Sequence, residues 1–235
     1  MEGEREEKHA HIPARDIINR IVLGGTDGVI ESIAITAGLN GAGIVFSAIR
    51  LAGVAFAFAG AFSMFFSSYI SGRAEQEILR KDIARERMEI ETEPDEEKAE
   101  LEALLKEEGY GAPEIETIVK RVIGDKDLWL RLQIRLELHQ DVANLEVNPL
   151  KGAGPAGVLF FIAASLPIVP YAFPITHEAA LLASLVVALT MLFIMGGTKF
   201  TTLREVDLKA GLEYAVIGGV AATILYAIGH FITFV

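Results

Sequence analysis

Four long apolar segments constrain this chain more than any other feature of its sequence. Residues 33–49, 51–72, 179–197 and 214–235 contain 17 to 22 residues each, and none of them includes Asp, Glu, Lys or Arg. About 20 apolar residues in a helix cross the hydrocarbon core of a bilayer. The sequence therefore predicts an all-α, multi-pass membrane protein that contacts the lipid bilayer.

We predict five transmembrane helices, because the turn sequence Asn40-Gly41-Ala42-Gly43 ends a first helix within the run 33–49, and a further span begins near Pro155. The predicted spans are 21–40, 46–70, 155–173, 179–197 and 214–235. Pro155 suits the first turn of the third span, where its missing N–H has no helical partner to lose. Pro167 and Pro170 are expected to kink that span, which membrane helices tolerate when neighbours satisfy the freed carbonyls.

A strongly charged segment lies between the second and third spans. Residues 73–146 contain 21 acidic and 12 basic side chains. The predicted domain organisation is a polar N-terminal tail, two spans, an acidic cytosolic helical domain and three further spans. Their ranges are 1–14, 15–72, 73–151 and 152–235.

Helices are predicted throughout this charged segment. The second transmembrane helix meets no breaker before Pro94, so it is expected to continue into the cytosol. Further helices are predicted from Asp95 and from Pro113. Apolar residues alternate with others over 128–138, which is the pattern of a strand. The length of that stretch, its leucine content and the lack of a partner strand favour a helix, and the pattern leaves open whether 128–141 is helical throughout.

The basic residues predict the orientation in the membrane. Of the 21 Lys and Arg residues, only Arg50 falls in a loop on the side opposite to the charged segment. Basic loops stay in the cytosol. The N-terminus and the central domain are therefore predicted to be cytosolic and the C-terminus to lie outside. The acidic start of the chain does not resemble a signal peptide.

Composition and missing motifs exclude several classes of function. A net charge of −11 argues against nucleic acid as a partner, because phosphates need a cationic surface. The chain has no cysteine, which removes disulfides, thiolate metal sites and cysteine nucleophiles. No phosphate-binding loop, Gly-x-Ser-x-Gly or His-Glu-x-x-His motif is present. We expect neither an enzyme nor a permanently bound cofactor.

Two acidic residues and one methionine are candidates for a transport pathway. Asp27 and Glu31 lie one turn apart in the first span, on one face. A charged side chain inside a membrane costs at least about 2.5 kcal/mol, which makes such residues functional candidates. Asp27 in the headgroups is the alternative. Met64 is predicted at the same depth as Asp27, although a membrane methionine is more often packing filler.

The charged domain contains glutamates at helical spacing. Glu86, Glu89 and Glu93 share one stripe of a helix, Glu97 and Glu100 share a face of the next, and Glu137 lies on the last. A cation between them would relieve the repulsion of like charges. The alternative is a solvated face neutralised by basic neighbours. His139 could be a further ligand, or an incidental residue.

Several motifs of this chain resemble those of the vacuolar iron transporter family. They are LGGTDGVIES at 23–32, AGAFSM at 59–64, Tyr69-Ile-Ser and KAGLE at 209–213, together with the charged insert after the second span. The resemblance covers nearly all of the chain beyond residue 14. It implies a homodimeric, five-helix, proton-coupled exporter of cytosolic Fe2+ that often accepts Mn2+ or other divalent ions, with Zn2+ as a further candidate substrate.

The resemblance also assigns residues. The membrane Asp and Met of the family match Asp27 and Met64, and its metal-binding glutamates match five residues of the charged domain. These are Glu86, Glu89, Glu97, Glu100 and Glu137. Three positions depart from the family pattern: Ser68 replaces a usual Glu, Gln133 and Ile134 stand where Met residues can occur, and Glu31 replaces a small or hydroxyl residue.

We therefore expect proton-coupled transport of a divalent transition metal out of the cytosol. A membrane-anchored metal buffer or interaction module that does not transport is the alternative. Buried carboxylates at Asp27 and Glu31 argue against an anchor, which does not need them. A prokaryotic cell membrane is favoured over a vacuolar membrane as the location.

Overall fold

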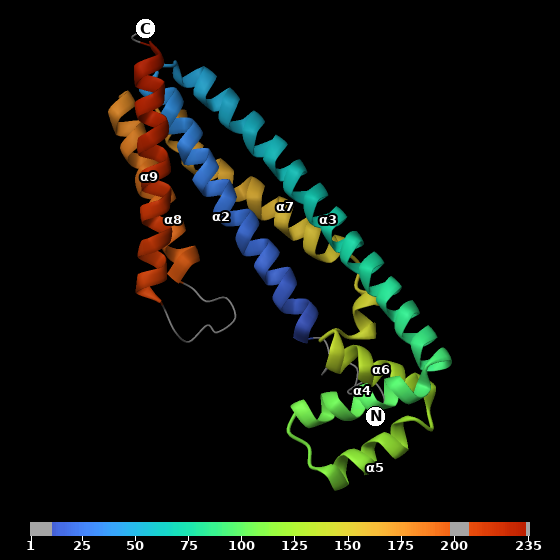
Figure 1. Cartoon of the computed structure of the whole chain (residues 1–235). Helices are drawn as coiled ribbons and strands as arrows, with labels where there is room; N and C mark the ends of the chain where they lie inside the picture. The colour runs from blue at the N-terminus through green and yellow to red at the C-terminus, as the bar shows by residue number, and fades with distance from the viewer. Residues whose placement is uncertain (1–10, 198–206, 234–235) are drawn as a thin grey trace, which may run out of the picture. The chain divides into compact units, whose positions relative to one another are not determined.

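The structure is a computed structural model that describes residues 11–197 and 207–233. Within these ranges every regular element is an α- or 3-10 helix, as predicted. The chain divides into two compact units (Figure 1). The membrane unit comprises the described residues up to Ile70 and from Pro149 onward. The inserted unit comprises Ser71–Asn148.

Five helices of the described residues are long and apolar enough to cross a membrane, which confirms the predicted number of spans. They are α2 (His11–Gly41), α3 (Phe46–Thr92), α7 (Leu150–Ser165) with its continuation η3 (Leu166–Ala172), α8 (His177–Gly197) and α9 (Leu208–Thr233). Helix α3 contributes its residues up to Ile70 to the membrane unit and the rest to the inserted unit.

Several predicted helix ends were wrong, and local hydrogen bonds explain one of them. Helix α9 begins at Leu208 instead of 214, because the Asp207 side chain caps it by accepting a hydrogen bond from the Ala210 N–H at 3.1 Å. The third span begins at Leu150 instead of Pro155, so Pro155 lies in the helix interior. Helix α2 begins at His11, within the predicted tail, whose residues 1–10 lie outside the described ranges.

The two later prolines of the third span change the type of helix. The α-helix ends at Ser165, and the chain continues as the 3-10 helix η3, which contains Pro167 and Pro170. The Ser184 hydroxyl of α8 donates a hydrogen bond to the Pro167 carbonyl. A polar side chain of a neighbouring helix thus satisfies a carbonyl at this transition, as expected for proline in a membrane helix.

Helix α2 is the centre of the membrane unit, because it packs against α7, α8 and α9 (Figure 1). Small residues on one stripe permit a close approach to α7. A Cβ atom on Gly28 would lie 2.7 Å from the Phe160 carbonyl oxygen. One turn later, the Ser32 hydroxyl donates a hydrogen bond to the Ala164 carbonyl at 2.6 Å. Small residues bring membrane helices together in this way, where lipid supplies no hydrophobic driving force.

The inserted unit is built from the later part of α3 and three shorter helices. These are α4 (Pro94–Glu107), α5 (Ala112–Val122) and α6 (Lys126–Glu137), followed by the 3-10 helix η2 (Val142–Glu146). Helix α3 ends at Thr92, just before Pro94, as predicted. Apolar side chains from all four α-helices form one core: Leu79, Ile90, Leu101, Leu105, Val119, Val122, Trp129, Leu130 and Ile134.

The segment with alternating hydrophobicity forms helix α6, as predicted, and the helix ends at Glu137, which answers the open question of how far it extends toward 141. Its buried residues are Trp129, Leu130, Gln133 and Ile134, a set with helical spacing. The Asp125 carboxylate caps the start of α6 by accepting a hydrogen bond from the Leu128 N–H at 3.1 Å. After the helix ends, His139 adopts a left-handed backbone with φ +52°.

Candidate metal sites

The structure brings together five predicted glutamates of the inserted unit. Glu86 and Glu89 project from α3, Glu97 and Glu100 from α4, and Glu137 is the last residue of α6. We call these five residues the glutamate cluster. Three of its members have raised pKa values to which other members contribute by charge repulsion. Residues far apart in sequence therefore form one electrostatic site.

Glu86 is the most buried carboxylate of the cluster, with 1% of its surface exposed. Burial, followed by the nearby charges of Glu137 and Glu97, raises its pKa from 4.5 to about 9. Its Oε1 atom accepts no hydrogen bond from a described residue. When Glu86 is protonated it can donate to Glu97 or Glu137, so a shared proton holds these carboxyl groups together.

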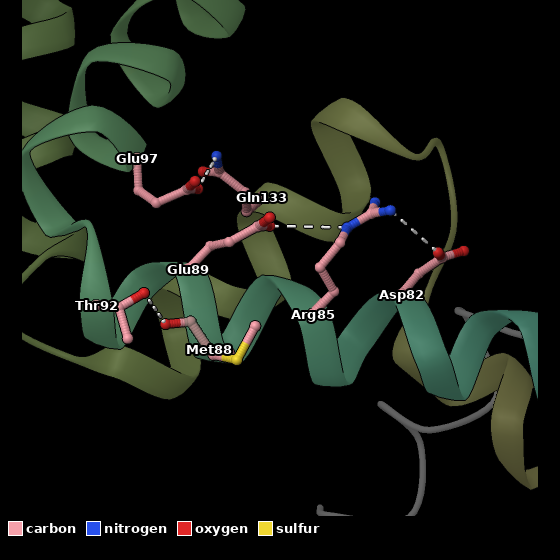
Figure 2. Close-up of polar contacts among 7 residues, drawn as sticks. All are labelled: Asp82, Arg85, Met88, Glu89, Thr92, Glu97 and Gln133. Carbon is pink, nitrogen blue, oxygen red and sulfur yellow. Dashed lines mark hydrogen bonds and ion pairs between the residues drawn. The ribbon is translucent and has the colours of Figure 1, made fainter.

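Glu97 is the second buried carboxylate, with 7% of its surface exposed. Figure 2 shows its side chain on α4 pointing toward Gln133 on α6, and the Gln133 Nε2 atom donates a hydrogen bond to Glu97 Oε2 at 3.0 Å. Burial raises the pKa of Glu97, and the charges of Glu100, Glu89 and Glu137 raise it further. A hydrogen bond from Glu86 opposes this shift.

The remaining cluster members are more accessible. Burial and the charges of Glu137 and Glu89 raise the pKa of Glu100. The Glu89 carboxylate lies 3.7 Å from Nε of Arg85, whose guanidinium also lies 3.8 Å from Asp82 (Figure 2). This arginine gives the cluster a partial counter-charge at its rim. The cluster thus combines a buried interior with an accessible edge.

Two further candidates, Glu93 and His139, are exposed side chains and do not belong to the buried part of the cluster. Glu93 has the helical spacing of Glu86 and Glu89, but α3 ends at Thr92, so it lies at the N-cap of α4. The His139 ring lies 3.2 Å from the carbonyl oxygen of Glu137 through Nδ1.

The cluster is not a finished coordination site. In the ranges 11–197 and 207–233, no three His, Asp or Glu side chains are already positioned to hold a metal ion. An ionised carboxylate can accept hydrogen bonds but cannot donate them. Several carboxylates can therefore approach one another closely only around protons or cations. The arrangement can hold protons when metal is absent and exchange them for a divalent cation.

The membrane candidates lie in the membrane unit. On α2, Asp27 is half-buried and Glu31 is exposed in the single chain. On α3, the half-buried Met64 packs close to α2: a Cβ on Gly24 would lie 3.3 Å from Met64 Cγ. Gly24 is about one helical turn from Asp27, so the thioether and the carboxylate occur at neighbouring levels of the two helices.

The Met64 thioether has a hydroxyl neighbour. Ser68 is buried one turn later on α3, and its Oγ atom donates toward Met64 Sδ at 3.8 Å. Ser68 is one of the three positions at which the sequence is expected to depart from the family pattern. The structure therefore places this departure beside one of the candidate transport residues, where a neutral hydroxyl takes the place of a carboxylate.

The sequence pattern did not indicate that Gln133 is buried beside the cluster. A polar residue in an apparently alternating segment suggests a solvent-facing position. In the structure Gln133 is fully buried beside the glutamate cluster. Its position one helical turn before Glu137 is the signal that could have found it, since residues four apart share a face.

Comparisons with known proteins agree with this architecture. A model of the VIT family matches residues 18–230. Vacuolar iron transporter 2 of Oryza sativa subsp. japonica is 29% identical over 92% of this chain and 88% of its own length. Vacuolar iron transporter 1 of Arabidopsis thaliana is 28% identical over 93% of this chain and 87% of its own length. The vacuolar iron transporter of Toxoplasma gondii is 28% identical over 100% of this chain and 80% of its own length. These relatives are named as transporters and not as enzymes. The chain belongs to the VIT family.

Proposed function

We propose that this protein transports divalent transition metal ions, Fe2+ and also Mn2+, out of the cytosol in exchange for protons. One observation carries the proposal: five glutamates from three helices form a cluster whose innermost carboxyl group, Glu86, is buried without a cationic partner among the described residues. The names of the family members, which specify iron, support the choice of substrate.

The glutamate cluster captures metal in this proposal. Glu86, Glu89, Glu97, Glu100 and Glu137 supply carboxylate ligands, with Glu93 and His139 available at the surface. Metal ligands must be deprotonated, so a cation that binds displaces the protons held by Glu86 and its neighbours. Acid returns the protons and releases the metal. The inserted unit then acts as a cytosolic store that raises the local metal concentration.

The membrane unit supplies the pathway, through Asp27, Glu31 and Met64. A carboxylate held in a bilayer costs at least about 2.5 kcal/mol, and a cation or proton that passes along the helix offsets that cost. Carboxylate and thioether ligands together suit a first-row transition ion better than Mg2+ or Ca2+. Protonation of Asp27 and Glu31 after metal release couples proton return to metal export.

A homodimer fits this pathway. Glu31 is exposed in the single chain, although it lies within a helix apolar enough to span a membrane. A second copy that covers this face would remove the carboxylate from lipid. Light scattering of the detergent-solubilised protein tests the stoichiometry, and a monomer that transports metal would refute the dimer.

Orientation follows from the distribution of basic residues. We place the N-terminus and the inserted unit in the cytosol and the C-terminus outside, in a prokaryotic cell membrane. This orientation makes export from the cytosol the direction of transport. Labelling of single introduced cysteines in intact cells tests it, because the natural chain has no cysteine to interfere.

Transport in proteoliposomes tests the function. The full-length protein should carry Fe2+ and Mn2+ across the vesicle membrane, faster with an opposing proton gradient. Asp27→Asn should abolish flux while leaving metal binding by the glutamate cluster intact. Replacing the five cluster glutamates by Gln should abolish that binding. Glu102→Gln, which changes an exposed carboxylate of α4, is the matched control and should affect neither.

The same assay separates the proposal from a membrane-anchored metal buffer. A buffer would bind metal through the glutamate cluster and leave sealed vesicles impermeable to every divalent ion. Flux that persists unchanged in Asp27→Asn would refute the assigned pathway, and absence of binding in the wild-type protein would refute the metal site.

A further inference from the structure

The Gln133 side chain is a buried amide with one unsatisfied oxygen. None of its surface is exposed, and its Nε2 atom donates to Glu97 Oε2 at 3.0 Å (Figure 2). This hydrogen bond sets the orientation of the amide, because the opposite orientation would place two acceptor oxygens against each other. The carbonyl oxygen Oε1 is left without a hydrogen-bond partner among the described residues.

A second unsatisfied oxygen belongs to the same cluster. Glu86 Oε1 is buried and accepts no hydrogen bond from a described residue, although the protonated carboxyl group can donate to Glu97 or Glu137. A buried acceptor without a partner costs about 1–3 kcal/mol, and more when it is charged. Gln133 and Glu86 occupy different helices, yet both are close to Glu97. The inserted unit therefore keeps two costly acceptors at one place in its interior.

A divalent cation can bind both acceptor oxygens and also offset the negative charge around them, whereas a hydrogen-bond donor does only the first. A water molecule could donate to the two oxygens, but once the carboxyl groups are ionised it would leave their mutual repulsion unchanged. A cation accepts electron pairs from the amide and carboxylate oxygens and also cancels the repulsion. The chemistry of the two orphaned oxygens thus points to a metal ion and not to a solvent molecule.

We propose that the amide carbonyl of Gln133 is a metal ligand and that it makes the glutamate cluster an all-oxygen site, which shifts relative affinity toward Mn2+ and away from softer ions such as Zn2+, compared with a site that contains sulfur. The inference rests on the proposed metal capture by this cluster and adds its ligand set and its preference. Carboxylate and carbonyl ligands suit Mn2+, whereas thioether and thiolate ligands select softer ions.

No sulfur ligand competes within the buried part of this unit. The chain has no cysteine, and Met88, the one methionine of residues 71–148, is 58% exposed on α3. Met88 points out of the core, where its neighbour Thr92 donates a hydrogen bond to the Met88 carbonyl and not to the sulfur (Figure 2). The polar side chains that are buried in this unit, Glu86, Glu97 and Gln133, therefore all present oxygen to a cation.

Variants of Gln133 in the full-length protein test the inference by calorimetry with Mn2+ and Zn2+. Gln133→Met exchanges the oxygen ligand for a thioether, so the ratio of Zn2+ affinity to Mn2+ affinity should rise at least about tenfold. Gln133→Leu should weaken Mn2+ binding more than Zn2+ binding. Gln140→Met, at an exposed position, is the matched control and should leave the ratio unchanged. Equal changes for both metals in Gln133→Met would overturn the inference.

A measurement on the wild-type chain is independent of how the variants fold. The sequence contains three glutamines, so 13C labelling of glutamine side-chain carbonyls gives few infrared bands. Binding of Mn2+ should shift one band to lower frequency, because coordination weakens the C=O bond. Absence of any shift on saturation would also overturn the inference. Wild-type protein that binds neither metal would instead refute the proposed function.

Discussion

Proton release from Glu86 gives the sharpest test of the metal site. The pKa of about 9 means that about 1% of Glu86 is ionised at pH 7 in the metal-free protein. A metal ion that uses this carboxylate must displace the proton, which costs about 2.7 kcal/mol at pH 7, or two pH units at about 1.36 kcal/mol each. The apparent affinity for Mn2+ should therefore be about 100-fold tighter at pH 8 than at pH 6 through Glu86 alone.

Calorimetry of the full-length protein in two buffers with different ionisation enthalpies measures the protons released. Glu86→Gln keeps the shape of the side chain but has no proton to lose, so it should release about one proton fewer per Mn2+ at pH 7. Glu102→Gln should release as many as the wild type. An unchanged proton count in Glu86→Gln, or an affinity that is flat between pH 6 and 8, would refute the reasoning.

The same pKa fixes the sign of the pH dependence of stability. The folded metal-free chain binds a proton at Glu86 that the unfolded chain loses above about 4.5. The stabilising contribution of this proton is fully present below pH 4.5 and is lost as pH rises through about 9. The metal-free inserted unit should therefore unfold more easily at pH 9 than at pH 5, and the difference should shrink in Glu86→Gln.

Three further predictions concern packing and charge. Gly28→Ala should lower the melting temperature, because the added Cβ would meet the Phe160 carbonyl and overpacking costs about 1–3 kcal/mol. Gly154→Ala is the control and should leave the melting temperature unchanged, because a Cβ there meets open space. Equal effects of the two variants would contradict the packing argument. Trp129, the single tryptophan, is 4% exposed, so its fluorescence emission should report unfolding of the inserted unit. Mn2+ at 100 times Kd should raise the free energy of unfolding by about 2.7 kcal/mol. An unfolding transition that Mn2+ does not shift would argue against binding to the folded unit. Arg85→Gln removes a half-exposed counter-charge from Glu89 and should tighten Mn2+ binding by about two- to threefold in calorimetry, whereas weaker binding would show that Arg85 supports the site.

The sequence was sufficient to predict the membrane helices because hydropathy along about 20 consecutive residues identifies them without any knowledge of tertiary contacts. Long and predominantly apolar runs identify the spans wherever they occur. Helix ends depend instead on single hydrogen bonds, such as the cap by Asp207, which hydropathy does not contain. The third span shows the same limit, since Pro155 suits a first turn but the structure accommodates it inside the helix.

The glutamates could be found from their spacing, but their environment could not. Helical spacing grouped Glu86, Glu89 and Glu93 equally, and the structure buries the first and exposes the last. The difference arises because Pro94 ends the helix and because α4 and α6 cover one part of it. Burial of Gln133 is likewise a tertiary property, since the alternating pattern around it hides the helical face on which it lies.

The hydrogen bond from Ser184 to the Pro167 carbonyl has a mechanical consequence. Breaking it would leave a bare carbonyl in hydrocarbon, at a cost of several kcal/mol. This cost favours movement of η3 and α8 together in any rearrangement of the membrane unit. A disulfide engineered between those two helices would accordingly leave transport intact, and a blocked transporter would show that they slide.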